Sequence, residues 1–151
     1  MPVAQEPSDP CDCVPSARRT HLPPPRELRD AYPVSAAGAR VVERGRRDSR
    51  RILRRQDDRF LVIVGPCSIH DPDAALDYAR RLAPVADALS DRPCVVVRAY
   101  FEKPRTTVGW RGLINAPNLD GGYDMAEGLR RARRLLVEIV DLGLPVATEL
   151  L

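Results

Sequence analysis

From residue 59 onward, three continuous apolar runs of strand length are separated by segments with helical periodicity. The first two runs, "RFLVIVG" and "PCVVVRAY", place apolar and β-branched residues side by side instead of alternating them with polar residues. Runs of this kind are typical of strands that are buried on both faces of a parallel sheet. The last run, "PVATELL", begins a third such strand. We therefore expect three parallel strands.

Two amphipathic helices are predicted between these strands. Asp71 is a favourable N-cap for the first helix, and Pro72 fits its first position. Pro84 is expected to kink or split this helix, because proline lacks a backbone donor. The second helix, over about residues 125–142, is expected to end before Gly143. Apolar residues on the expected core faces recur at helical spacing: Leu76, Ala79, Ala83 and Ala86, and then Leu129, Ala132, Leu136, Ile139 and Val140.

This order of strand, helix, strand, helix and strand predicts parallel pairing with right-handed crossovers. An open doubly wound sheet and a barrel both fit, although no G-x-G-x-x-G motif follows the first strand. Both architectures bind ligands at the carboxyl ends of their strands. Here these ends read "GPCSIHD", "RAYFEKPRTT" and "TEL". The unusual chemistry of the chain is therefore expected on one face.

The N-terminal third has a different composition. Residues 1–33 hold eight of the fifteen prolines, which favours an extended or mobile arm over regular structure. Residues 15–59 carry thirteen arginines against six acidic residues. A basic helix is predicted over about residues 41–56, and its arginines form either a nucleic-acid surface or a solvated face with Ile52 and Leu53 turned inward. The stretch lacks interleaved aromatic residues and reading motifs, which favours the solvated face.

Composition otherwise indicates a soluble globular protein. The chain has 151 residues, of which 44% are hydrophobic and 30% are charged, and its net charge is +3. No apolar run approaches the roughly 18 residues of a membrane span, and the first residues lack the pattern of a secretory signal. We expect a cytoplasmic protein with reduced cysteines and no membrane partner. The pair Cys11 and Cys13 lacks the second pair that a zinc framework requires.

Cys67 and His70 follow the first strand. A thiolate at a strand end can bind a divalent metal or act as a nucleophile, whereas a small buried cysteine without a chemical role is the alternative. His70 directly precedes the predicted N-cap, so it has either a structural role or a role as a ligand.

Basic residues gather after the second strand. Lys103 is the only lysine, since every other basic residue of the chain is an arginine. With Arg98, Arg105 and the hydroxyl of Thr106, it would form a cradle for phosphate or carboxylate groups. The alternative is a surface loop with scattered charge. Glu149, at the end of the third strand, would act as an acid, base or water-positioning group, or would pair with one of these cations.

With these residues in view, the segments "DDRFLVIVGPCSIHDPDAALDYARRL", "RAYFEKPRTTVGWRGLINAPNLDGGYD" and "GLRRARRLLVEIVDLGLPVATELL" resemble class I 3-deoxy-D-arabino-heptulosonate 7-phosphate (DAHP) synthases. The joint presence of GPCSIHD and KPRTTVGW distinguishes this family from the related 3-deoxy-octulosonate 8-phosphate synthases. The resemblance implies a (β/α)8 barrel, of which residues 40–151 would be the N-terminal portion, preceded by a Pro-rich arm over residues 1–39.

The resemblance also implies an activity. Such synthases condense phosphoenolpyruvate with erythrose 4-phosphate and water, and they release phosphate in the first step of the shikimate pathway. Carried over by motif, Cys67 would bind a divalent metal ion such as Mn, Fe, Co or Zn. Arg98 and Lys103 would be catalytic and hold phosphoenolpyruvate, with Glu149 nearby. The contacts with erythrose 4-phosphate would come from consecutive residues: Lys103, Pro104, Arg105 and Thr106.

A complete barrel of this kind takes about 250 residues. The further metal ligands of the family come from later strands, so we expect a fragment that is inactive and poorly folded in isolation. Full-length relatives are expected to be homo-oligomers under feedback control by an aromatic amino acid. A non-catalytic piece that pairs with a complete synthase, and an Arg-rich nucleic-acid module, are the alternatives.

Overall fold

Three parallel strands form the sheet that the apolar runs predict. The computed structural model describes residues 21–103 and 109–149. The sheet has the order β1 (Phe60–Val64), β2 (Pro93–Arg98), β3 (Val146–Ala147). Val64 is paired with Val97, and Arg98 with Ala147, both in parallel register. The prediction of parallel strands is therefore confirmed, and the carboxyl ends of all three lie at one edge of the sheet.

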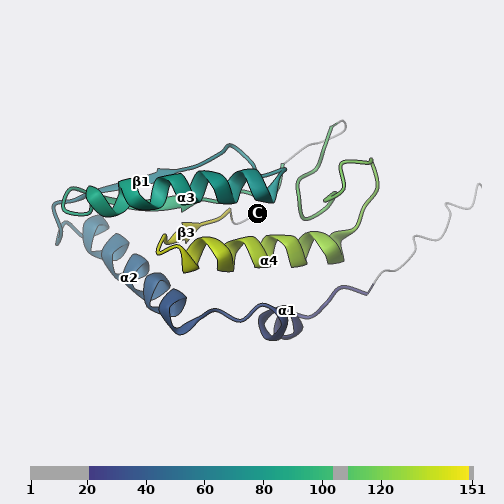
Figure 1. Cartoon of the computed structure of the whole chain (residues 1–151), viewed down its shortest axis with the longest axis horizontal. Coiled ribbons are helices and arrows are strands. Elements are labelled where there is room, and N and C mark those ends of the chain that lie inside the picture. The colour runs from purple at the N-terminus through teal and green to yellow at the C-terminus, as the bar shows by residue number, and fades with distance from the viewer. Residues whose placement is uncertain (1–20, 104–108, 150–151) are drawn as a thin grey trace, which may run out of the picture.

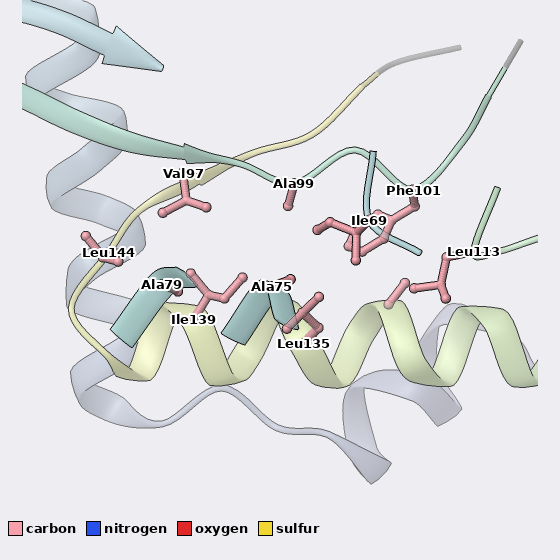
Figure 2. Packing of buried hydrophobic residues seen from close by; sticks show 11 residues of the cluster. Ile69, Ala75, Ala79, Val97, Ala99, Phe101, Leu113, Leu135, Ile139 and Leu144 are labelled. Atoms are coloured by element: carbon pink, nitrogen blue, oxygen red, sulfur yellow. The ribbon is translucent and has the colours of Figure 1, made fainter. Parts of the chain in front are cut away.

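The two predicted crossover helices are α3 (Pro72–Ala88) and α4 (Met125–Asp141). The Asp71 carboxylate accepts hydrogen bonds from the backbone N–H groups of Asp73 and Ala74, which confirms the predicted N-cap. Figure 1 shows α3 and α4 running along the sheet. Both helices turn small and branched side chains toward β2 and the chain that continues it (Figure 2).

The core lies between these helices and the sheet. Leu113, Leu135 and Ile139 are its largest fully buried side chains. Its buried members come from every part of the described chain after β1: Ile69, Ala75, Ala79, Val97, Ala99, Phe101, Leu113, Ala132, Leu135, Ile139 and Leu144. Because Ala99 and Phe101 belong to the chain that leaves β2, the core reaches as far as the strand ends where the predicted chemistry lies.

One element-level alternative is excluded and one prediction is wrong. Pro84 does not split the helix, since α3 continues unbroken through it while Ala83 and Ala86 on either side pack against the core. A kink at Pro84 stays a prediction. The strand β1 is not buried on both faces, because the Ile63 side chain is 54% exposed and Phe60 is 75% exposed. Ile63 lines an open groove, and β1 lies at the edge of the described sheet, where β2 is its only strand neighbour.

The chain before β1 contains more regular structure than predicted. A short helix α1 (Pro25–Ala31) lies inside the segment that was expected to stay irregular, with a proline at its first position. The basic helix is α2 (Ala36–Leu53), and it begins earlier than predicted because the Ser35 hydroxyl caps it by accepting from the Gly38 N–H. The expectation for Leu53 is wrong, since this residue is 75% exposed, whereas Ile52 is half-buried. The proposed boundary between residues 39 and 40 stays a prediction.

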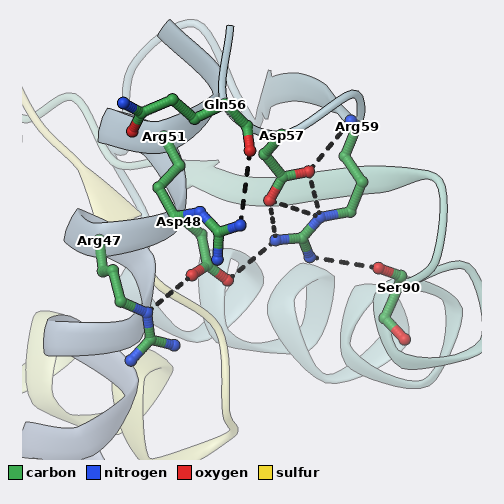
Figure 3. A network of polar contacts seen from close by, with 7 residues as sticks. All are labelled: Arg47, Asp48, Arg51, Gln56, Asp57, Arg59 and Ser90. Carbon is green, nitrogen blue, oxygen red and sulfur yellow. Dashed lines mark hydrogen bonds and ion pairs between the residues drawn. The ribbon is translucent and has the colours of Figure 1, made fainter. Parts of the chain in front are cut away.

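Ion pairs fix the end of α2 to the start of β1 (Figure 3). The Arg59 guanidinium lies 2.8 Å from an Asp57 oxygen and 3.1 Å from an Asp48 oxygen of α2. Its Nη1 group also donates to the Ser90 carbonyl, between α3 and β2. One side chain therefore joins three elements at the end of the sheet opposite the strand tips. Within the described residues, none of the helices combines the length and the apolar character that a membrane span requires.

Candidate functional site

The turn after β1 lies directly against the end of β2. A Cβ atom on Gly65 would come within 2.3 Å of the Arg98 carbonyl oxygen, so this close approach requires glycine. Two residues later Cys67 is exposed, whereas Ile69 is buried and donates its N–H to the Tyr100 carbonyl at 2.7 Å. The turn is thus anchored on the chain that leaves β2, and the Cys67 side chain remains accessible. The alternative of a buried cysteine is therefore wrong, whereas a chemical role for Cys67 stays a prediction.

Lys103 meets Cys67 at this edge. Its Nζ lies 3.2 Å from the Cys67 Sγ and donates to it. The Lys103 side chain is half-buried, and its backbone N–H donates to the Arg111 carbonyl at 3.2 Å. The predicted convergence of the first two strand ends is therefore present.

Arg98 completes this group of side chains from the last position of β2. Its Nε donates to the Pro66 carbonyl at 3.2 Å, and its guanidinium lies over the Tyr100 ring at 5.1 Å from the ring centre. In the described part of the chain the two Nη groups have no hydrogen-bond partner, so they can bind an anion while Nε holds the side chain in place.

Glu149 does not pair with Arg98 or Lys103 among the described residues. One oxygen of its carboxylate accepts the backbone N–H groups of Phe101 at 2.8 Å and of Glu102 at 2.7 Å, and the other accepts from the Thr148 hydroxyl. Burial opposes ionisation of this carboxyl, but the hydrogen bonds outweigh it and lower the pKa of Glu149. The contact reaches from the end of β3 to the backbone next to Lys103.

Three of the predicted substrate-binding residues, Pro104, Arg105 and Thr106, lie outside the described residues. Their contact with a substrate stays a prediction, as does any pairing of Arg105 with Glu149.

His70 contacts an aromatic residue from the second half of the signature. Its ring packs edge-on against Trp110, with 6.4 Å between the ring centres, and the Trp110 Nε1 donates to the Ala116 carbonyl at 2.8 Å. The GPCSIHD and KPRTTVGW segments thus touch through these two rings, which supports a structural role for His70.

The sequence did not single out Glu102 or Asn115. Glu102 forms an isolated antiparallel bridge with Gly112, and its carboxylate accepts a short hydrogen bond from the Asn115 side-chain amide. The contact depends on the chain folding back after β2, and only the glycines of "TVGWRGLIN" hint at that return.

A divalent metal would find one thiolate ligand here, that of Cys67. Among the residues that the structure describes, no three His, Cys, Asp or Glu side chains gather at a distance that could hold an ion. Structural and catalytic sites for such ions use three or four protein ligands. The described residues therefore do not make a complete metal site by themselves.

Comparison with known proteins identifies relatives of this arrangement. The model of the DAHP synthetase I family matches residues 32–151. The phospho-2-dehydro-3-deoxyheptonate aldolase of Amycolatopsis methanolica is 57% identical over 127 residues, which cover 84% of this chain and 63% of that protein. The tyrosine-inhibited enzyme of the same name from Schizosaccharomyces pombe is 48% identical over 130 residues, which cover 86% of this chain and 35% of that protein.

A solved structure gives the same result for the fold. The phospho-2-dehydro-3-deoxyheptonate aldolase from Francisella tularensis superposes with a TM-score of 0.86 at 42% sequence identity. The match covers 89% of this chain and 40% of that structure. The chain thus spans 35% of the Schizosaccharomyces pombe relative, 63% of the Amycolatopsis methanolica relative and 40% of the solved structure.

Proposed function

Because the chain belongs to the DAHP synthetase I family, we propose that it supplies part of the active site of a DAHP synthase. The reaction joins phosphoenolpyruvate and erythrose 4-phosphate, consumes water, and yields 3-deoxy-D-arabino-heptulosonate 7-phosphate and phosphate. The relatives from Amycolatopsis methanolica and Schizosaccharomyces pombe carry the aldolase name of this activity, which supports the proposal.

The observation that carries the proposal is the 3.2 Å contact between Lys103 and Cys67, with Arg98 fixed beside them at the Pro66 carbonyl. Both substrates carry phosphate, so they repel one another unless cations lie between them. Arg98 offers a bidentate fork to one anion. Lys103 is a compact cation with three donors that can contact groups of both substrates. Fixed cations of this kind hold two reactants in a reactive geometry.

Cys67 is proposed as one ligand of a divalent metal ion, whose other ligands would lie outside the described residues. Such an ion would polarise the aldehyde of erythrose 4-phosphate. The site described here contributes the binding and orientation of phosphoenolpyruvate through Arg98 and Lys103. Feedback by an aromatic amino acid and assembly of several copies are further parts of the proposal, and the tyrosine-inhibited relative supports the first.

Phosphate release tests this proposal. The chain is combined with the portion of the Schizosaccharomyces pombe relative that follows its aligned region, and the two substrates are supplied with a divalent metal salt. We expect phosphate only when both substrates and both polypeptides are present. Lys103→Met should reduce the release at least about tenfold, the loss expected for a charge that orients substrate.

Arg81→Met is the matched control, because this cation lies on α3 in an exposed pair with Asp77. It should leave phosphate release unchanged. Equal phosphate release by the Lys103→Met and Arg81→Met variants would contradict the proposed role of the site.

A further inference from the structure

We propose that Glu102 is a positioning residue that fastens segment 101–103 to segment 111–116 and thereby holds Lys103 against Cys67. This inference rests on the proposed function in one respect, namely that Lys103 binds substrate. The arrangement itself consists of contacts between described residues, and its test requires no turnover.

Hydrogen bonds join the two segments on both sides of Glu102. The Leu113 N–H donates to the Phe101 carbonyl at 2.6 Å, and the Lys103 N–H donates to the Arg111 carbonyl at 3.2 Å. Between them, the Glu102 carboxylate accepts from the Asn115 side-chain amide. The backbone contacts set the separation of the two segments, and the side-chain contact locks their register next to Lys103.

Ionisation of the Glu102 carboxyl is unfavourable in its buried environment. Its Oε1 atom is inaccessible to solvent and has no hydrogen-bond partner among the described residues. Burial raises the pKa of Glu102, and the nearby Glu149 carboxylate adds to this effect. Hydrogen bonds from Asn115 and from the Ile114 backbone oppose the rise without cancelling it. A buried polar atom without a partner is rare in folded proteins, so the Glu102 carboxyl is held in this place against a desolvation cost.

The chain just after β3 contacts the same residue. The Glu149 carboxylate accepts the backbone N–H of Glu102 at 2.7 Å. Glu102 is therefore held through its own amide by Glu149 and through its side chain by Asn115 of the 111–116 segment. Because the lysine side chain is flexible, a fixed backbone is what limits the space that its ammonium explores.

The reactivity of Cys67 reports on this geometry. The full 151-residue chain is treated with the anionic reagent iodoacetate at neutral pH in the presence of a chelator, and the modification of each cysteine is followed by peptide mass spectrometry. Lys103→Met should slow alkylation of Cys67 by about fivefold, because the ammonium beside the sulfur attracts the carboxylate of the reagent, and the loss of one unit charge in a well-solvated site costs about this factor. Glu102→Ala should slow it to a similar degree. The double variant should be no slower than Lys103→Met alone.

Two controls separate positioning from loss of structure. Cys94 is 8% exposed, so its alkylation reports opening of the whole fold and should stay slow in every variant. Glu102→Gln retains an acceptor for the Asn115 amide and should keep the Cys67 rate within about twofold of the original. If Glu102→Ala exposes Cys94, Asn115→Ala is used in its place, because it removes the same contact from the other segment. This variant should then slow the alkylation of Cys67.

The proposal is overturned if Glu102→Ala, or Asn115→Ala where the former unfolds, leaves the Cys67 rate unchanged while Cys94 stays protected. It is equally overturned if Glu102→Ala slows Cys67 by the same factor with and without Lys103, because the two residues would then act independently. A failure of the proposed function would show differently, as absent phosphate release with an intact dependence of Cys67 on Glu102.

Discussion

At the scale of single residues, the one lysine of the chain lies beside the Cys67 thiol. Its ammonium reaches the Cys67 sulfur from a half-buried side chain, with the backbone of Arg111 close behind it. The fork-shaped cation of this site is Arg98, which stacks on Tyr100 and binds the Pro66 carbonyl. A planar guanidinium and a small ammonium thus have separate positions, and they are not interchangeable.

Replacement of the lysine by arginine tests this division. We expect Lys103→Arg to weaken binding of phosphoenolpyruvate about tenfold although the charge is kept, because a planar guanidinium does not reproduce the contacts of a compact ammonium. The affinity is measured from the quenching of Trp110, the only tryptophan of the chain. The converse change at an exposed position, Arg111→Lys, is the control and should leave the affinity unaltered. Full affinity in Lys103→Arg would show that charge alone matters.

Asp57 provides a second prediction at this scale. The side-chain hydrogen bond from Arg59 is the main reason that the pKa of Asp57 falls from an ordinary 3.8 to about 2. Because the pKa of Asp57 is lower in the folded state, its ionised form stabilises the fold at pH values above its ordinary pKa of 3.8. This stabilisation disappears as the pH falls toward 2. Asp57→Asn should therefore lower the urea midpoint at pH 7, and the difference from the original chain should shrink between about pH 4 and pH 2.

The control for this measurement is Asp77→Asn, which removes the exposed pair with Arg81 on α3. Exposed pairs contribute little to stability, so its midpoint should follow that of the original chain at every pH. A difference for Asp57→Asn that stays constant down to pH 2 would disprove the assigned role of the ion pair.

The sequence predicted the residues that follow directly from strand ends. Cys67, Arg98 and Lys103 lie within five residues of an apolar run, so the parallel order of the strands was enough to bring them together. Glu102 and Asn115 could not be paired in this way, because their contact forms where the chain returns after β2. For Glu149 the strand end was right, and among the described residues its carboxylate accepts from backbone amides instead of from Arg98 or Lys103.

At the scale of elements, the return of the chain beside Phe101–Lys103 depends on Gly112. Its φ of 111° is one that residues with side chains rarely adopt, and a Cβ atom there would lie 2.3 Å from the Phe101 carbonyl oxygen. Gly112→Ala should therefore destabilise the fold by about 3 kcal/mol, since backbone strain and a steric clash act together. Urea unfolding followed by Trp110 fluorescence measures the loss.

Gly121 is a matched control for this substitution. It also has a positive φ, 81°, but no atom lies within 4 Å of the position of its missing Cβ. Gly121→Ala should cost only about 1 kcal/mol, the price of the backbone conformation alone. Equal losses at the two glycines would mean that the close approach to Phe101 contributes nothing.

Among the elements, features that depend on local sequence were predicted correctly, whereas features that depend on tertiary packing were not. The N-cap at Asp71 and the stop at Gly143 are local, and both predictions held. The continuity of α3 through Pro84 and the exposure of β1 depend on what packs against them. The helix α1 was missed because the abundance of prolines around it outweighed the favourable position of one of them.

At the scale of the whole molecule, apolar surface stays open beside the sheet. The helices α3 and α4 pack against the sheet with the core, and a groove of about 870 Å³ opens between the strands, α2 and α4. Leu61, Ile63 and Val96 line it from the sheet, and Leu53 from α2. Contiguous exposed apolar surface of this kind is uncommon on monomeric soluble proteins and promotes association.

This groove should make the isolated chain bind the dye ANS and associate as its concentration rises. Ile63→Thr keeps a β-branched residue in β1 but removes apolar surface from the groove, so it should reduce dye fluorescence and association while helicity is preserved. Val85→Thr is the matched control, because Val85 is 51% exposed on α3 outside the groove. The same substitution there should leave both readouts unchanged. Equal effects of the two variants would mean that dye binding and self-association report general loosening of the packing and not the apolar surface of the groove.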